Sequence, residues 1–221
     1  MEVIILAGGL GTRLQSVIND IPKPMAPIRE IPFLCYVLDW LKTQKVQKCV
    51  FAVGYKHECI MQYFGDTYKG INLVYSIEET PLGTGGAIKL AFRYCKGEDV
   101  FVVNGDTLFC INLNQLKQIH NGKFTMSCVY KEDASRYGLV ELEGNKVVKL
   151  VEKQERTQGW INGGVYLMNK EIFDEYDGKF SLETELLPKL VICGIVNAKV
   201  GKEYFIDIGI PQDYERAKKE L

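Results

Sequence analysis

The chain has 221 residues, of which 47% are hydrophobic and 25% charged, and its formal net charge at pH 7 is -1. This length fits one globular domain with its own core, and the near-zero charge lacks the basic footprint of nucleic-acid-binding proteins. No apolar run approaches the ~20 residues of a membrane-spanning helix, so we expect no nucleic acid and no membrane as partner.

The N-terminus and the cysteines bear on the cellular compartment. The sequence starts at once with a strand pattern rather than with a charged segment and a cleavage site, so we expect no secretory signal. The seven cysteines are odd in number and include no C-x-x-C pair, which argues against a disulfide framework and a zinc site. Buried, reduced thiols are therefore expected, and with them a cytoplasmic protein.

In chain order, the first half alternates strand and helix patterns. We expect strands at 2–6, 48–53, 71–77 and 99–103, and helices at 33–45, 57–64 and 85–94. Apolar strands that alternate with helices predict an α/β fold, with a Rossmann-like, mostly parallel central sheet flanked by helices. Ligands bind such sheets beyond the carboxyl ends of the strands. Three polar strand ends, at 8–13, 54–55 and 105–106, should therefore form one site.

The second half changes character. Strand patterns at 124–130, 138–143, 147–152 and 161–168 are joined by short turns, and residues 143–146 read as a hairpin connection. A helix at 182–191, a strand at 204–208 and a helix after Pro211 follow. We therefore expect a smaller β-rich part within a single domain that spans residues 1–221.

A glycine cluster directly follows the first strand. Backbone N–H groups of such a loop can approach a phosphate closely, and Arg13 and Lys23 supply positive charge. The Walker A motif fits poorly because Thr12-Arg13 follows Gly11, and the dinucleotide fingerprint fits poorly because Leu14 replaces its third glycine. We predict a polyphosphate-binding loop, with nucleotide-binding residues Leu6, Ala7, Gly8, Gly9, Gly11, Thr12, Arg13 and Lys23.

Two aspartates have the positions expected of metal ligands. Asp106 ends the strand pattern at 99–103 in the sequence Asn-Gly-Asp, which is also ordinary turn chemistry. Asp207 lies among apolar residues, where a carboxylate is costly unless it has a partner. Both are oxygen donors of the kind that Mg²⁺ takes. The alternative for Asp207 is to cap the last helix, although residues 211–213 provide their own start signal.

A second glycine-rich loop, residues 82–87, stands between a strand and a helix. Because the first loop accounts for the phosphates, we predict that Gly83, Thr84 and Gly85 lie against the nucleobase. Glu78 and Glu79 precede this loop, and their carboxylates can accept hydrogen bonds from the N1–H and N2–H groups of guanine. The alternative is that both glutamates are solvated surface residues, as glutamates usually are.

Polar residues and glycines also interrupt the later strands. We predict that Lys153 binds a phosphate, that Glu152 and Asn162 bind sugar hydroxyls, and that the Gly138 N–H donates to the ligand. The sugar-phosphate-binding set is Asp106, Tyr137, Gly138, Glu152, Lys153, Asn162 and Gly163. Taken singly, each interruption is also compatible with a bulge or a turn. His57 and His120 lack ligand spacing and are expected at the surface.

Together these motifs resemble the sugar-1-phosphate nucleotidylyltransferase family along essentially the whole chain. The matching pieces are G-G-x-G-T-R-L at 8–14, Lys23-Pro24, Gly54-Tyr55, P-L-G-T-G-G-A at 81–87, Gly105-Asp106, Tyr137-Gly138, Glu152-Lys153, N-G-G at 162–164 and Asp-Ile-Gly at 207–209. The loop around residue 83 is similar to that of guanylyl- and mannose-type members. The resemblance implies a GT-A-like fold, residues 1–110 mainly for the nucleotide, and residues 111–221 mainly for the sugar phosphate.

The implied reaction needs no covalent nucleophile. The phosphate of a sugar 1-phosphate attacks the α-phosphorus of GTP, and pyrophosphate leaves. In this scheme Arg13, Lys23 and Asp106 are catalytic, and Asp106 and Asp207 hold Mg²⁺. Within the family, the compact length and the loop sequence look most like those of members that act on a heptose 1-phosphate. Mannose 1-phosphate with GTP, or a hexose or muramyl phosphate with UTP, stays open as an alternative. A different class of function is an inactive regulatory subunit, which should have lost one of Arg13, Lys23, Asp106 and Asp207, whereas this chain has all four. Whether the chain forms a homodimer stays open.

Overall fold

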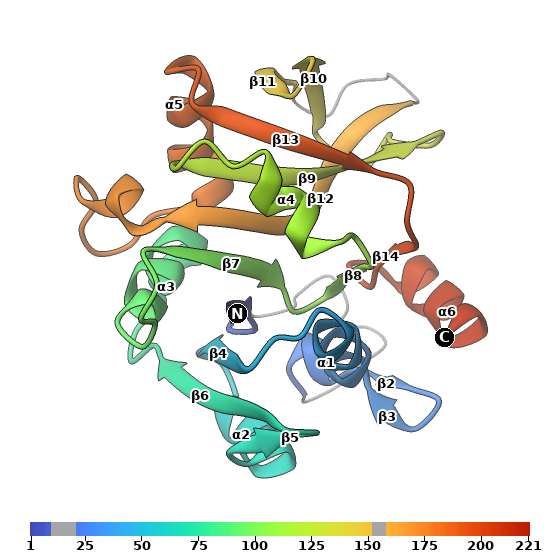
Figure 1. Ribbon diagram of the computed structural model, residues 1–221. Coiled ribbons are helices and arrows are strands. Elements are labelled where there is room, and N and C mark those ends of the chain that lie inside the picture. Colours follow the sequence, from blue (N-terminus) through green and yellow to red (C-terminus); the bar gives the residue numbers. More distant parts are fainter. Residues whose placement is uncertain (10–20, 152–157) are drawn as a thin grey trace.

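The structure is a computed structural model that describes residues 1–9, 21–151 and 158–221. One ten-stranded mixed sheet runs through the molecule (Figure 1). In spatial order its strands are β10 (Leu139–Glu143), β11 (Lys146–Val151), β13 (Val196–Gly201), β9 (Phe124–Lys131), β12 (Gly159–Asn169), β7 (Asp99–Asn104), β1 (Glu2–Leu6), β4 (Lys48–Val53), β6 (Ile71–Ile77) and β5 (Thr67–Tyr68). The expected α/β fold is confirmed.

The parallel part of the sheet comprises β7, β1, β4 and β6. Ile5 is paired with Phe51 on one side and with Val103 on the other. The inner strand β1 is covered on both faces, which is why Val3, Ile4 and Ile5 are all fully buried in succession, whereas β6, nearer the sheet edge, leaves Asn72 and Ile77 exposed. Parallel neighbours need crossover connections, and α1 (Phe33–Thr43), α2 (His57–Phe64) and α3 (Gly83–Phe92) belong to them.

The remaining strands extend the same sheet in mostly antiparallel pairings. β12 runs antiparallel to both β7 and β9, and the β10–β11 hairpin pairs Glu143 with Lys146, as the turn pattern predicts. β13 is an additional strand that sequence reasoning missed, although Asn197 and Lys199 alternate with its apolar residues in the manner of a half-buried strand. It pairs in parallel with β9. Two short sheets are formed by β8 (Thr107–Phe109) with β14 (Phe205–Asp207), and by β2 (Pro27–Ile28) with β3 (Ile31–Pro32).

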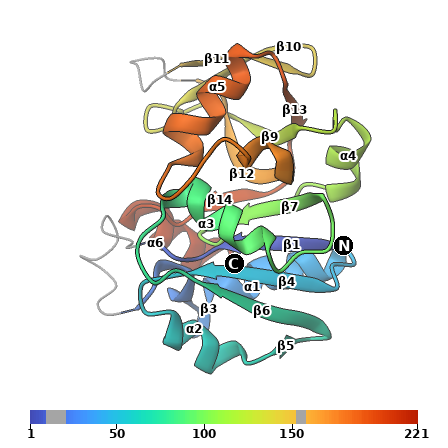
Figure 2. The same cartoon turned by 90° about the vertical axis from the view of Figure 1, so that its left-hand side faces the viewer.

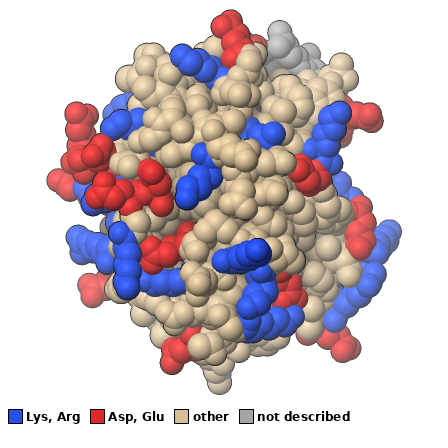
Figure 3. Space-filling view, viewed as in Figure 1, with Lys and Arg blue, Asp and Glu red and all other residues tan. Residues whose placement is uncertain are grey.

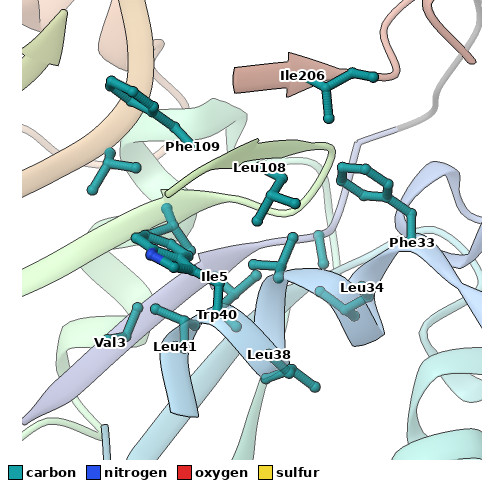
Figure 4. Packing of buried hydrophobic residues seen from close by; sticks show 14 of the residues in the cluster. Val3, Ile5, Phe33, Leu34, Leu38, Trp40, Leu41, Leu108, Phe109 and Ile206 are labelled. Atoms are coloured by element: carbon teal, nitrogen blue, oxygen red, sulfur yellow. The ribbon is translucent and has the colours of Figure 1, made fainter. Parts of the chain in front are cut away.

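Helices cover the two faces of the sheet with separate apolar cores (Figure 2). On one face lie α1, α2, α4 (Leu113–Gln118) and α6 (Pro211–Glu220). Figure 4 shows Phe33, Leu38 and Trp40 of α1 in one apolar cluster with strand residues such as Ile5 and Leu108. The apolar surface of α1 therefore belongs to the core.

On the other face, α3 packs with η3 (Lys170–Phe173), η4 (Leu182–Leu186) and α5 (Leu187–Ile192), while η2 (Lys23–Met25) lies on the α1 side. The expected helix at 182–191 is present, with a π-helical first turn. All seven cysteines are free thiols, but the expected burial holds only for Cys35, Cys49 and Cys128, and Cys193 is exposed. Among the described residues, no helix combines the length and apolarity needed to cross a membrane. Charges of both signs are interspersed over the face in Figure 3.

Candidate functional site

The carboxyl ends of β1, β4 and β7 open into a cleft of about 1210 Å³. The cleft exceeds the ~300–1,000 Å³ of a typical ligand pocket, so it has room for a nucleotide. Among its lining residues are Leu6, Ala7, Gly8, Gly9, Lys23, Gly54, Tyr55, Glu78, Glu79, Gly83, Thr84, Asn104 and Asp106. Because Leu6 is paired with both Ala52 and Asn104, the three strands end together. The predicted convergence of their polar ends is confirmed.

The two described glycines of the first loop have different surroundings. A Cβ at Gly8 would lie 2.8 Å from Glu78 Oε1 and 3.0 Å from the Gly54 nitrogen, so packing against β4 and β6 requires glycine there. A Cβ at Gly9 would meet nothing within 4 Å, which leaves its backbone open to a ligand. The predicted roles of Gly11, Thr12, Arg13, Glu152 and Lys153 concern residues outside the described part of the chain and stay predictions.

Lys23 and the two aspartates form one cluster. The Lys23 ammonium donates a hydrogen bond to the Asp106 carboxylate, and the Lys23 side chain is only 11% exposed. Asp207 pairs with Thr107 across the β8–β14 sheet, and the Ile208 N–H donates to the Asp106 carbonyl at 3.0 Å. This pairing brings the backbones of the two aspartates close together, although they are far apart in the sequence, and of the two only Asp106 lines the cleft.

Asp207 is held from two sides. The Tyr137 hydroxyl donates to Asp207 Oδ2, and the Gly209 N–H donates to Oδ1 at 2.8 Å. Burial, together with the neighbouring Asp207, raises the pKa of Tyr137, so this hydroxyl is protonated at neutral pH. The helix-cap alternative for Asp207 is wrong, because Asp207 ends β14 and α6 begins with no side-chain cap. Of the two neighbouring residues predicted to bind the sugar phosphate, Tyr137 thus contacts Asp207 and Gly138 is exposed.

The donor set of this cluster fits a magnesium ion in part. Carboxylate oxygens are hard ligands of the kind that Mg²⁺ prefers, and Mg²⁺ commonly keeps waters and takes phosphate oxygens beside one or two carboxylates. In the described ranges, no group of three or more His, Cys, Asp or Glu side chains is placed to hold a metal. A Mg²⁺ ion at Asp106 and Asp207 would therefore complete its coordination with phosphate oxygens and water.

At the end of β6, beside Gly8, Glu78 is half-buried and Glu79 is exposed. Glu78 Oε2 accepts a hydrogen bond from the Leu82 N–H at 2.7 Å, and burial raises the pKa of the Glu78 carboxyl. This carboxylate thus fastens the second glycine loop to the end of β6. Both glutamates line the cleft, as the proposed base contact requires.

The glycines of the second loop are required by a neighbouring segment. Gly83 has φ +72°, and a Cβ there would lie 2.5 Å from the Phe180 carbonyl oxygen. A Cβ at Gly85 would lie 2.2 Å from the Phe180 ring. Gly83 and Thr84 line the cleft, whereas Gly85 is buried and does not. The predicted base-facing position is therefore wrong for Gly85, whose missing side chain makes room for Phe180.

Replacing Gly85 with alanine should destabilise the fold by about 1–3 kcal/mol, the cost of overpacking a tight core. The new methyl group would collide with the Phe180 ring, which is itself 3% exposed. Urea unfolding followed by circular dichroism measures the free energy of unfolding. Gly9→Ala is the matched control, because its new methyl group meets open space. Equal stability of Gly85→Ala and the wild type would contradict this account of the glycine.

Asn162 and Gly163 lie at an irregularity in β12. The pairing with β9 changes register between Asn162 and Tyr166. Asn162 donates to the Tyr166 hydroxyl at 2.7 Å and accepts from the Gly164 N–H at 2.9 Å, so both ends of its amide are engaged. A Cβ at Gly163 would lie 2.6 Å from the Phe109 ring. Neither residue is among those that line the described cleft.

Sequence reasoning missed several cleft residues. Asn104 and Glu183 line the cleft, and so does His57, which was expected at the surface. His57 is partly exposed in the cleft, which agrees with that expectation. The same expectation is wrong for His120, because its side chain is 6% exposed and its ring contacts the Thr125 hydroxyl at 2.9 Å. Asn104, directly before Gly105-Asp106, could have been found from its strand-end position. Glu183 offered no local signal, because only tertiary contacts bring it to the cleft.

Comparisons with known proteins agree with this geometry. The family model described as nucleotidyl transferase matches residues 2–221. The chain is 46% identical to a D-glycero-alpha-D-manno-heptose 1-phosphate guanylyltransferase of Aneurinibacillus thermoaerophilus, covering 100% of this chain and 98% of that protein. It is also 46% identical to the protein of the same name from Campylobacter jejuni, covering 97% of each.

A solved structure extends the similarity to three dimensions. The crystal structure of HddC from Yersinia pseudotuberculosis complexed with GMP-PN superposes on this chain with a TM-score of 0.89. The two sequences are 40% identical, and the alignment covers 99% of this chain and 98% of HddC. The similarity thus extends over essentially the whole chain, including the elements on both faces of the sheet and the strand ends that form the cleft.

Proposed function

Because the chain belongs to the nucleotidyl transferase family, we propose that it transfers GMP from GTP to D-glycero-α-D-manno-heptose 1-phosphate. The products are GDP-heptose and pyrophosphate, and GDP-heptose is a donor for surface polysaccharide synthesis. The observation that carries the choice of substrates is the 46% identity, over essentially the full length, with two heptose 1-phosphate guanylyltransferases. The free cysteines favour a cytoplasmic location for this reaction.

The proposed reaction is a direct, in-line phosphoryl transfer. An oxygen of the sugar phosphate attacks the α-phosphorus of GTP, the bond to the bridging oxygen of the β-phosphate breaks, and pyrophosphate leaves with the electron pair. Such reactions depend mainly on positioning and on stabilisation of the charge that develops. The chain therefore needs cations at the phosphates rather than a covalent nucleophile.

The described residues supply several of these roles. Lys23 would stabilise the charge that develops around the α-phosphate, with Asp106 fixing its position. Asp106 and Asp207 would hold Mg²⁺, which supplies Lewis-acid neutralisation of the reacting phosphates when bound. Arg13 would bind the departing pyrophosphate and Lys153 the sugar phosphate. Glu78 and Glu79 would accept hydrogen bonds from the N1–H and N2–H groups of guanine.

A matrix of pyrophosphate-release assays tests the proposal. The purified chain is assayed with Mg²⁺ and each common nucleoside triphosphate, paired with heptose, mannose or glucose 1-phosphate. We expect GTP with heptose 1-phosphate to give the highest kcat/KM. A higher kcat/KM with mannose 1-phosphate would replace heptose 1-phosphate as the proposed sugar substrate. A higher kcat/KM with UTP or CTP would refute the proposed recognition of guanine. If no pair of nucleoside triphosphate and sugar phosphate releases pyrophosphate, the result would favour an inactive regulatory subunit.

A further inference from the structure

A segment of the second half of the chain reaches across to the glycine loop beside α3. Within this segment, residues 178–183, Phe180 makes three backbone hydrogen bonds to the loop. Its carbonyl accepts from the N–H groups of Gly85, at 3.1 Å, and Gly86, at 3.4 Å, and its own N–H donates to the Leu82 carbonyl at 2.9 Å. The loop that borders the nucleotide side of the cleft is thus held by the 178–183 segment.

The same segment fixes the hydroxyl group of Thr84. Thr84 Oγ1 donates to Glu183 Oε2 at 2.5 Å and accepts from the Leu182 N–H at 2.9 Å. Ser181 Oγ also donates to this carboxylate oxygen, at 3.3 Å. The single hydroxyl proton of Thr84 and one of its lone pairs are therefore both engaged, so its side chain has one preferred orientation.

The start of α3 depends on these contacts because the helix has no capping side chain of its own. Its N-cap residue is Leu82, which cannot accept a hydrogen bond through its side chain. The Phe180 carbonyl takes two of the N–H groups that a helix start leaves without partners. The Glu183 carboxylate adds negative charge at this positive end of the helix. An external segment thus replaces the missing cap.

This arrangement determines what the cleft presents to a base. Gly83 and Thr84 line the cleft, and no described residue accepts a hydrogen bond from the backbone N–H of either one. A nucleobase with acceptors on its edge needs such donors at a defined place. The position of both N–H groups follows from the first turn of α3, which the 178–183 segment holds.

We propose that Glu183 is a positioning residue for the nucleobase. Its carboxylate holds Thr84, and through Thr84 the first turn of α3, although Glu183 comes from the half of the chain assigned to the sugar phosphate. The inference rests on the proposed function, because it takes the ligand at this loop to be the base of a nucleoside triphosphate. Base recognition then depends on both halves of the chain.

Steady-state kinetics of Glu183→Ala, Glu183→Gln, Thr84→Val and the Glu183→Ala/Thr84→Val double variant test this role. We expect Glu183→Ala and Thr84→Val each to raise the KM for GTP roughly tenfold, the scale of one lost hydrogen bond to a charged group. The KM for the sugar phosphate and kcat should stay within about twofold. The double variant should resemble either single variant, because both remove the same contact. Glu183→Gln keeps an acceptor for Thr84 and should stay close to the wild type.

Glu185→Ala is the matched control. Glu185 lies in the same turn, is exposed, and accepts from the Ser181 N–H at 2.9 Å rather than from the loop. Its removal should leave the KM for GTP unchanged. Calorimetric binding of a non-hydrolysable GTP analogue, together with thermal unfolding, separates a loss of affinity from a loss of folded protein. If Glu183→Ala does not fold, Thr84→Val and Glu183→Gln still decide the outcome.

Three results would overturn the proposal. A rise in the KM for the sugar phosphate alone would mean that Glu183 contacts the sugar. Additive effects in the double variant would mean that the two residues act independently. Equal losses in Glu183→Gln and Glu183→Ala would assign the effect to the negative charge of the carboxylate, at the ligand or at the helix end, and not to its hydrogen bond with Thr84. If the wild type prefers another nucleoside triphosphate, the guanine assignment fails, and the same variants measured with that nucleotide still test the positioning role.

Discussion

Replacing Lys23 with alanine should lower kcat by roughly 10²–10³ or more, the scale of losing one preorganised electrostatic stabiliser. The Lys23 ammonium is nearly enclosed, lines the cleft, and contacts the Asp106 carboxylate. A charge held in such a partly dry site acts on the reacting phosphates more strongly than a solvated lysine does. Single-turnover pyrophosphate release at saturating GTP and sugar phosphate measures the chemical step directly.

The rate of Lys23→Ala is meaningful only if the variant is as fully folded as the wild type at the assay temperature. Removing Lys23 leaves Asp106 without its cationic partner, so thermal unfolding should accompany every rate measurement. Lys202→Ala is the matched control, because Lys202 is exposed and lies outside the cleft lining. We expect its rate to equal that of the wild type. A folded Lys23→Ala protein with a near-wild-type rate would show that the catalytic cation is elsewhere.

Replacing Asp106 with alanine should also lower kcat by roughly 10²–10³ or more. Two effects of this substitution act together. Lys23 loses the group that fixes its ammonium, and the proposed metal site keeps only Asp207 as a carboxylate ligand. The Mg²⁺ concentration that gives half-maximal activity should therefore rise as well. A magnesium titration of the rate, at saturating substrates, measures this second effect.

Metal binding itself provides a readout that is independent of turnover. Mn²⁺ binding followed by electron paramagnetic resonance, in the presence of GTP, should weaken in Asp106→Ala and in Asp207→Ala. Asp66→Ala serves as the control, because Asp66 is exposed and lies outside the cleft lining. Unchanged Mn²⁺ affinity in both site variants would refute the assignment of these aspartates as metal ligands.

Local sequence patterns accounted well for the parallel part of the sheet. The strands at 48–53 and 71–77 and the helix at 57–64 have the boundaries that the apolar spacing predicts. In this region β4 is buried on both faces, β6 alternates between buried and more exposed residues over much of its length, and glycine or polar residues bound both strands, so the pattern along the chain carries the information. The same reasoning placed Gly8, Gly54 and Asp106 at one sheet edge.

The sequence by itself determined the α/β fold, the glycine loop after the first strand, and Lys23, Asp106 and Asp207 as candidate charged residues, because these follow from short-range spacing and strand ends. The tertiary structure alone decided which groups meet. The Tyr137 contact with Asp207 depends on loop packing, and the Glu183 contact with Thr84 depends on a segment about a hundred residues away. Such partners are chosen by strand pairing and core packing, and neither leaves a periodic signal near the residues themselves.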